Sequence, residues 1–308
     1  MFRCLFVLVV LSLLGVASVS AQGDEVSQEF GDALLALADL DHYTVTWEIE
    51  ISEQIALWDG DELTHDVGRE ITLAYTDHYQ AGAEHFTFQR LVTATEQRLY
   101  EGQTVMYTAE IRIVEGTIYL RTEVLEGEMS SGCPREWVEW RYPDQWPALE
   151  DLLPDTYFAA VELNNPLPLF DLAPDTVAAL TAGPVAVDEA DWHETAARRL
   201  VVARGHEETR QVLQTRPSLN MSDPYDQALL GYLTPASSIR VMAYFDQGEL
   251  IGIEDYAYRE TTPFARSVFE DGAPDNLSLS VSNTRTSAID FRDVNADFVP
   301  VDAPPGID

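Results

Sequence analysis

The chain contains no lysine, so all 18 of its basic side chains are arginines. Without a lysine amine, Schiff-base chemistry is excluded, and so is a phosphate-binding loop that uses a lysine. The arginines are outnumbered by 53 aspartates and glutamates, and the formal net charge of the 308 residues is −35. Such a chain repels nucleic acid and has no basic patch that would release counterions. We therefore expect no nucleic-acid partner.

Cysteine is also scarce, with Cys4 and Cys133 as its two instances. Cys133 lies in a turn-rich stretch with no nucleophile signature around it, and we interpret it as a structural thiol. The histidines show no His-Glu-x-x-His spacing, and the chain has no Gly-x-Ser-x-Gly elbow. We therefore predict no catalytic residue, no metal site, no cofactor and no enzymatic activity; a histidine-dependent hydrolase is the alternative. The six histidines are His42, His65, His78, His85, His193 and His206.

Residues 1–21 have the pattern of a secretory signal peptide. A short basic start is followed by an apolar run over 5–16, and small residues precede a cleavage point after Ala21. An uncleaved anchor is the alternative. Cys4 precedes the apolar run, so it cannot be the lipidated cysteine of a bacterial lipoprotein signal. No later run is long enough to span a bilayer, so we expect an exported, periplasmic or extracellular protein.

The excess of acids allows two interpretations. One is a solvated surface that resists aggregation, and the other is a calcium-binding surface. The only short acidic loop of interest, 59–61, reads Asp-Gly-Asp and is too short for a calcium loop. We favour the solvated surface.

The stretch 42–126 is predicted to be a series of β-strands. In 43–51, apolar residues alternate with threonine and glutamate, and the same alternation recurs over 70–76 and 104–113. Side chains of a strand alternate between its faces, so the pattern predicts an antiparallel sheet with one apolar face. Several of the strands are a dozen residues long, and long strands tend to curl into a sheet with a concave side.

The rest of the chain is predicted to add helices and further strands to the same sheet. We expect helices at 30–40, 207–216 and 224–233, and an apolar segment at 154–181 that covers the sheet. A strand at 193–202, a hairpin at 239–245 and 250–259, and closing strands at 277–282 and 288–294 complete the set. Because no linker interrupts the chain, we predict a single α+β domain over 22–308.

Several stretches together resemble a known family. They are Leu-Asp-His-Tyr-Thr-Val-Thr-Trp-Glu at 40–48, Gly-Thr-Ile-Tyr-Leu-Arg at 116–121, and the longer stretches 239–254 and 289–304. In their order the chain resembles the LppX/LprG-type bacterial lipoproteins, relatives of the lipoprotein carrier LolA. The resemblance implies a half-barrel with helices packed in the concave face around an apolar cavity, and a role in binding or carrying lipids in the cell envelope. The lipobox cysteine of that family is absent here.

The function predicted on this basis is an exported binding protein or carrier for a hydrophobic ligand, a lipid or an acyl chain. Burial of an acyl chain in such a cavity contributes about 0.8 kcal/mol per CH₂ group. The alternative is an acidic scaffold of the envelope that uses the same fold without cargo and contacts envelope proteins. The predicted ligand-binding residues are Tyr43, Val45, Trp47, Ile49, Ile71, Leu73, Tyr75, Phe86, Phe88, Val105, Tyr107, Ile111 and Ile113.

Overall fold

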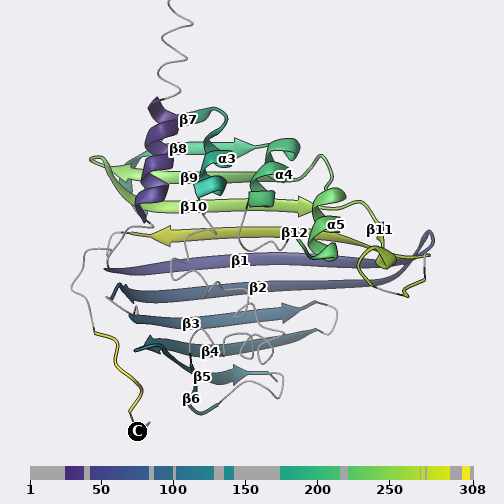
Figure 1. Cartoon of the computed structure of the whole chain (residues 1–308), viewed down its shortest axis with the longest axis horizontal. Coiled ribbons are helices and arrows are strands. Elements are labelled where there is room, and N and C mark those ends of the chain that lie inside the picture. The colour runs from purple at the N-terminus through teal and green to yellow at the C-terminus, as the bar shows by residue number, and fades with distance from the viewer. Residues whose placement is uncertain are drawn as a thin grey trace, which may run out of the picture.

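A computed structural model describes the chain in ten stretches, from near its N-terminus almost to its C-terminus. These stretches are 25–37, 42–82, 87–99, 102–127, 135–141, 174–215, 221–270, 272–274, 276–291 and 300–305. Phe86 and the greater part of the predicted segment 154–181 lie outside the described residues. The described residues form one twelve-stranded antiparallel sheet with helices on one side of it (Figure 1).

The sheet follows the order β6-β5-β4-β3-β2-β1-β12-β10-β9-β8-β7, and β11 pairs with β12. The last long strand, β12, thus joins the N-terminal strands to the C-terminal ones by pairing with β1. The strands are β1 (His42–Asp59), β2 (Glu62–Gln80), β3 (Thr87–Arg98), β4 (Gln103–Val114), β5 (Thr117–Glu126), β6 (Val138–Arg141), β7 (Val185–Trp192), β8 (Thr195–Arg204), β9 (Ser238–Asp246), β10 (Glu249–Glu260), β11 (Phe264–Ala265) and β12 (Leu277–Asp290).

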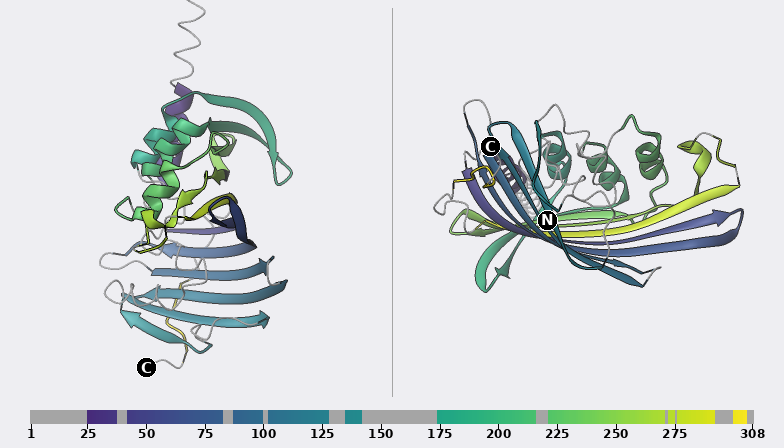
Figure 2. Two further views of the ribbon diagram at one scale, coloured as in Figure 1. Left: turned by 90° about the vertical axis from the view of Figure 1, so that its right-hand side faces the viewer. Right: turned by 90° about the horizontal axis from the view of Figure 1, so that it is seen from below.

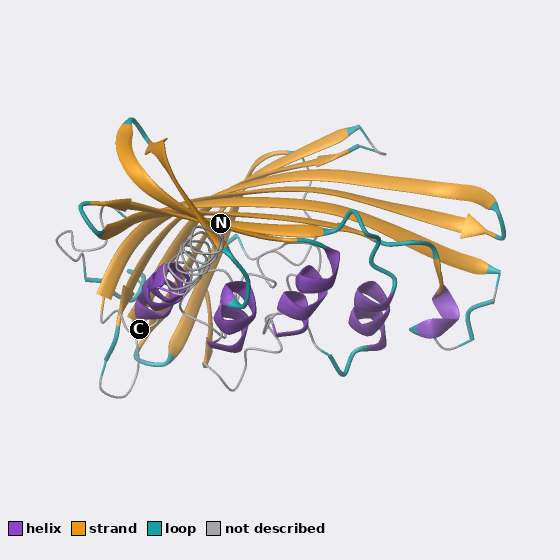
Figure 3. Cartoon of the chain, turned by 90° about the horizontal axis from the view of Figure 1, so that it is seen from above, coloured by secondary structure: helices purple, strands orange, loops and turns teal. Residues whose placement is uncertain are grey.

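The helices all lie on the same side of the sheet (Figure 3). They are the N-terminal helix (25–36), α3 (Pro174–Thr181), α4 (His206–Thr215), α5 (Pro224–Gly231) and the 3₁₀ turn η2 (Arg266–Val268). The start of α5 shows why the chain turns helical there. Asp223 caps the helix by accepting a hydrogen bond from the backbone N–H of Tyr225 at 2.8 Å, and Pro224 supplies the φ of the first turn.

The sheet is bent and open, and the helices pack against its concave side (Figure 2). The prediction of a curled antiparallel sheet with helices in its concave face is therefore confirmed. The face that carries the helices is called the inner face below, and the opposite face the outer face. The β7–β8 hairpin bends away from the helices toward the outer side (Figure 2).

Several predicted element boundaries were wrong. The closing strands at 277–282 and 288–294 are one continuous strand, β12, whose middle carries polar inner-face residues such as Asn283 that interrupt the alternation. The helix predicted at 30–40 begins earlier, at residue 25. The strand predicted at 193–202 begins at Thr195, because His193 and Glu194 form the turn of the β7–β8 hairpin with φ of 44° and 69°.

The inner face carries the main hydrophobic core. Cross-strand register places residues of the same face opposite one another, so Trp47 faces Tyr75, Tyr75 faces Val92, and Val92 faces Ala109. The core continues onto β8, β9 and β10 and includes Phe30 of the N-terminal helix and Leu213 of α4. The amphipathic helices thus cover apolar surface that the alternation of the strands provides.

Candidate functional site

Of the thirteen predicted ligand-binding residues, twelve are described, and all twelve lie on the inner face. Their exposed fractions run from 1% to 5%, so each is part of the core. Aromatic stacking joins several of them: the rings of Trp47 and Tyr75 lie 4.3 Å apart, and Tyr43 stacks on Tyr79 at 5.1 Å. The alternation therefore predicted the burial of these side chains correctly. Their role in ligand binding stays a prediction.

An ion pair lies within this apolar surface. Arg90 donates two hydrogen bonds of 2.8 Å to the carboxylate of Asp77, and the indole N–H of Trp47 donates to the same carboxylate at 3.0 Å. The guanidinium also lies 5.1–5.3 Å from the ring centroids of Trp47, Tyr75 and Phe88. We call these five residues the ion-pair cluster.

Electrostatics keep the ion-pair cluster charged. Burial acts to lower the pKa of Arg90, but the Asp77 carboxylate outweighs it, and the pKa of Arg90 is raised. Burial, reinforced by the Asp77 charge, raises the pKa of Tyr43 well above its ordinary value, so that phenol stays neutral. The sequence analysis missed this cluster, although a signal was present. Asp77 lies two residues after Tyr75, and Arg90 lies two residues before Val92, so both continue the inner-face alternation.

A cavity opens at a different place on the inner face, beneath α4 and α5. Its volume is about 120 Å³, and we call it the inner cavity. Its polar end is ordered: Glu53 accepts a hydrogen bond from Arg69 at 2.7 Å, and Arg259 donates one to Asn283 at 3.0 Å. The cavity is lined by Leu213, Tyr225, Leu229, Leu230, Leu233, Val281 and Thr261, with Glu53, Arg259 and Asn283 at its polar end.

None of the thirteen predicted residues lines the inner cavity. Its walls come from α4 and α5, from β10 and β12 with Leu233 and Thr261 beside them, and from β1, which lies far from all of these in sequence. Apolar walls of this kind can hold a hydrocarbon chain, and charged groups at one end can orient a polar group.

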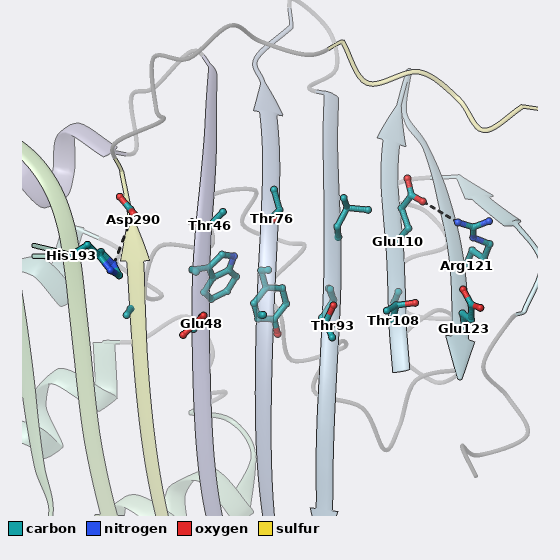
Figure 4. Close-up of a pocket in the computed structure, with 17 residues that line it drawn as sticks. Thr46, Glu48, Thr76, Thr93, Thr108, Glu110, Arg121, Glu123, His193 and Asp290 are labelled. Atoms are coloured by element: carbon teal, nitrogen blue, oxygen red, sulfur yellow. Dashed lines mark hydrogen bonds and ion pairs between the residues drawn. The ribbon is translucent and has the colours of Figure 1, made fainter. Parts of the chain in front are cut away.

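A larger groove of about 530 Å³ lies on the outer face, across β1 to β5 and β12 (Figure 4). It is bordered at one end by Arg121 and Glu123 of β5. At the other end lie His193 and Asp290, whose Nε2 and Oδ2 atoms are 3.9 Å apart. A second hollow of about 320 Å³ adjoins it over β9, β10 and β12. Between the ends the floor presents the outward side chains of Thr46, Glu48, Thr76, Thr93, Thr108 and Glu110. We call the two hollows together the outer groove.

Beside the outer groove, the β7–β8 hairpin is pinned to the outer face by a small apolar contact. The Trp192 ring lies 4.6 Å from the Tyr244 ring and directly over Gly252, where any side-chain carbon would overlap the indole. Burial and a hydrogen bond to Glu254 raise the pKa of Tyr244 to about 12. We call Trp192, Ala197, Tyr244 and Gly252 the Trp192 cluster. Glycine is required at 252 because only it leaves room for the indole.

Comparison with known proteins gives similarity of fold alone. No family model matches the chain, and no curated protein matches it. LprF from Mycobacterium bovis is similar in structure over 91% of this chain and 96% of its own, with 8% identity and a TM-score of 0.33. A beta-barrel-like protein of the domain of unknown function DUF1849 from Brucella abortus is similar over 79% of this chain and 97% of its own, with 8% identity and a TM-score of 0.20. At these values neither similarity bears on function, and membership of the LppX/LprG-type lipoproteins stays a prediction.

The described histidines are not gathered into one site. His78 contacts the Thr44 hydroxyl at 2.9 Å and His193 lies near Asp290, while His85 is outside the described residues. Within the described stretches, no group of three or more histidine, cysteine, aspartate or glutamate side chains is placed to hold a metal ion. No helix among the described residues is long and apolar enough to cross a membrane.

Proposed function

We propose that this chain is an exported, non-enzymatic binding protein that carries a hydrophobic ligand, a lipid or an acyl chain, in the cell envelope. The observation that carries the proposal is the inner cavity, with leucine walls and a polar end formed by Glu53, Arg259 and Asn283. An acyl chain would gain about 0.8 kcal/mol for each CH₂ group buried there. The signal-peptide pattern over 1–21 supports export.

The size of the inner cavity sets how a ligand would enter. Its 120 Å³ corresponds to about four water molecules and is below the roughly 300–1,000 Å³ of ordinary ligand pockets. The cavity therefore holds the end of a chain as it stands. A longer ligand requires α5 to move outward, and α5 is a helix of only 8 residues.

The test is the uptake of a fluorescent fatty acid by the purified protein, with organic extraction and mass spectrometry of the protein as isolated. Val281→Phe places an aromatic ring in the inner cavity, and we expect it to weaken fatty-acid binding at least about tenfold, a loss of about 1.4 kcal/mol. Leu91→Phe, on the exposed outer face, is the matched control and should bind as the unaltered chain does. Absence of extracted lipid together with absence of uptake would refute the proposal.

One observation favours a second candidate, the acidic envelope scaffold without cargo. The twelve described residues predicted to bind ligand have exposed fractions of 1–5%, so that part of the inner face offers a ligand no accessible surface. The scaffold hypothesis predicts that Val281→Phe stabilises the fold by filling unused space. A rise in unfolding free energy for this variant, with no fatty-acid uptake by either protein, would support it.

A further inference from the structure

The outer groove is long enough for a polymer. Its two hollows share Glu48 and Ala288, and together they run from β5 to β9 across eight neighbouring strands. Neighbouring strands lie about 4.8 Å apart, so the groove extends over about 34 Å. That length matches an extended peptide of about ten residues at about 3.4 Å each.

Acidic side chains outnumber basic ones in the outer groove, where Arg121 and the exposed Arg240 are the arginines among the described lining residues. Glu110 is engaged by Arg112 and Arg121, and Glu254 accepts a hydrogen bond from Tyr244. Three further carboxylates, Glu48, Glu50 and Glu123, are exposed and make no ion pair with any described residue. The groove therefore keeps an excess of negative charge along its floor, with Arg240 as the exposed positive charge at its β9 end.

The groove also offers groups that suit a peptide. The hydroxyls of Thr46, Thr76, Thr93 and Thr108 lie along the floor and can bond to a peptide backbone. Leu91 is 41% exposed there, and it can take the aliphatic stem of an arginine or lysine while the charged end reaches a carboxylate.

We propose that the outer groove binds an extended, positively charged segment of a partner protein. A second copy of this chain would bring another net charge of −35 and be repelled. A small polycation would cover only part of the length. The same field would steer a basic segment toward the face, so association should be fast at low salt and slow as salt rises.

The test uses the full chain and a fluorescein-labelled ten-residue peptide of alternating arginine and serine. Binding is followed by fluorescence anisotropy at about 20 mM and about 150 mM salt, where the Debye length is about 20 Å and about 8 Å. We expect saturable binding that weakens with salt. The triple variant Glu48→Gln, Glu50→Gln and Glu123→Gln should raise the Kd at least about tenfold, as expected for three exposed charge pairs.

The matched control removes three exposed carboxylates outside the groove, with Asp61→Asn, Glu62→Gln and Glu249→Gln. It changes the net charge equally and should raise the Kd less than about threefold, because screening weakens distant charges. Equal weakening by both triple variants would overturn the proposal, since binding would then follow net charge alone. Absence of peptide binding, or displacement of the peptide by spermine at equal concentration, would overturn it too.

Discussion

Each face of the sheet contains one group of residues whose polarity is opposite to that of the rest of the face. The inner face is apolar and holds a buried charged pair, Asp77 and Arg90, among aromatic rings. The outer face is polar and holds a buried apolar contact, Trp192 over Gly252, beside carboxylates. The comparison shows that the buried pair of the inner face is stabilised by hydrogen bonds, whereas the Trp192 indole of the outer face is held by close packing alone, since its N–H has no partner among the described residues. The predictions below remove these interactions from one face and then from the other.

The largest expected effect comes from breaking the ion-pair cluster. Asp77→Ala deprives Arg90 and the Trp47 indole of their buried acceptor, and we expect a loss of about 3–5 kcal/mol in the free energy of unfolding, measured by urea denaturation. Glu270→Ala, which removes an exposed pair with Arg266, is the control and should cost less than about 1 kcal/mol.

A double variant separates charge from packing in that cluster. Asp77→Leu with Arg90→Met removes both charges and keeps apolar volume, so it should recover most of the stability that Asp77→Ala loses. If the double variant is less stable than Asp77→Ala, the ion pair stabilises the fold by more than its burial costs, which would contradict this prediction.

The sequence predicted the character of each face far better than the position of the cavity. The alternation in 43–51 and 104–113 follows from backbone geometry alone, so Tyr43, Trp47 and Ile111 were correctly assigned to the apolar face, where they are buried. The inner cavity depends instead on how α5 lies on β12 and on the pairing of β12 with β1 across more than two hundred residues of chain. No local pattern records that pairing.

The outer groove was missed for a related reason. Its glutamates and threonines were interpreted only as the solvent-exposed face of each strand, because the pattern of a single strand indicates no more than that. Their concentration in one hollow comes from the bending of the sheet and from the β7–β8 hairpin, which brings His193 to Asp290. Neither the bend nor the hairpin position follows from the residues of one strand.

A smaller effect is expected from breaking the Trp192 cluster. Gly252→Ala puts a methyl group into the space of the Trp192 indole, and we expect a loss of about 1–3 kcal/mol of stability by thermal or urea unfolding. Gly231→Ala is the matched control, because nothing lies within 4 Å of the added carbon there, and it should leave stability unchanged or raise it. Equal effects of the two changes would show that glycine entropy, and not the indole, sets the result.

The smallest expected effect is a pH dependence carried by His78 on the outer face. Burial lowers the pKa of His78, and the neighbouring Asp77 charge opposes that shift without cancelling it. As the pH falls through about 6.5, the unfolded chain binds a proton that the folded chain does not yet bind, so the free energy of unfolding falls. This loss levels off once the pH is below the pKa of His78 in the folded chain.

His78→Gln can keep a hydrogen bond to Thr44 and removes the titration. Between pH 7.5 and 5.5, at constant ionic strength, the unaltered chain should lose more unfolding free energy, or gain less, than the variant does. Because the carboxylates are the same in both proteins, that difference isolates His78, and identical pH profiles would show that its surroundings do not disfavour the charged imidazole.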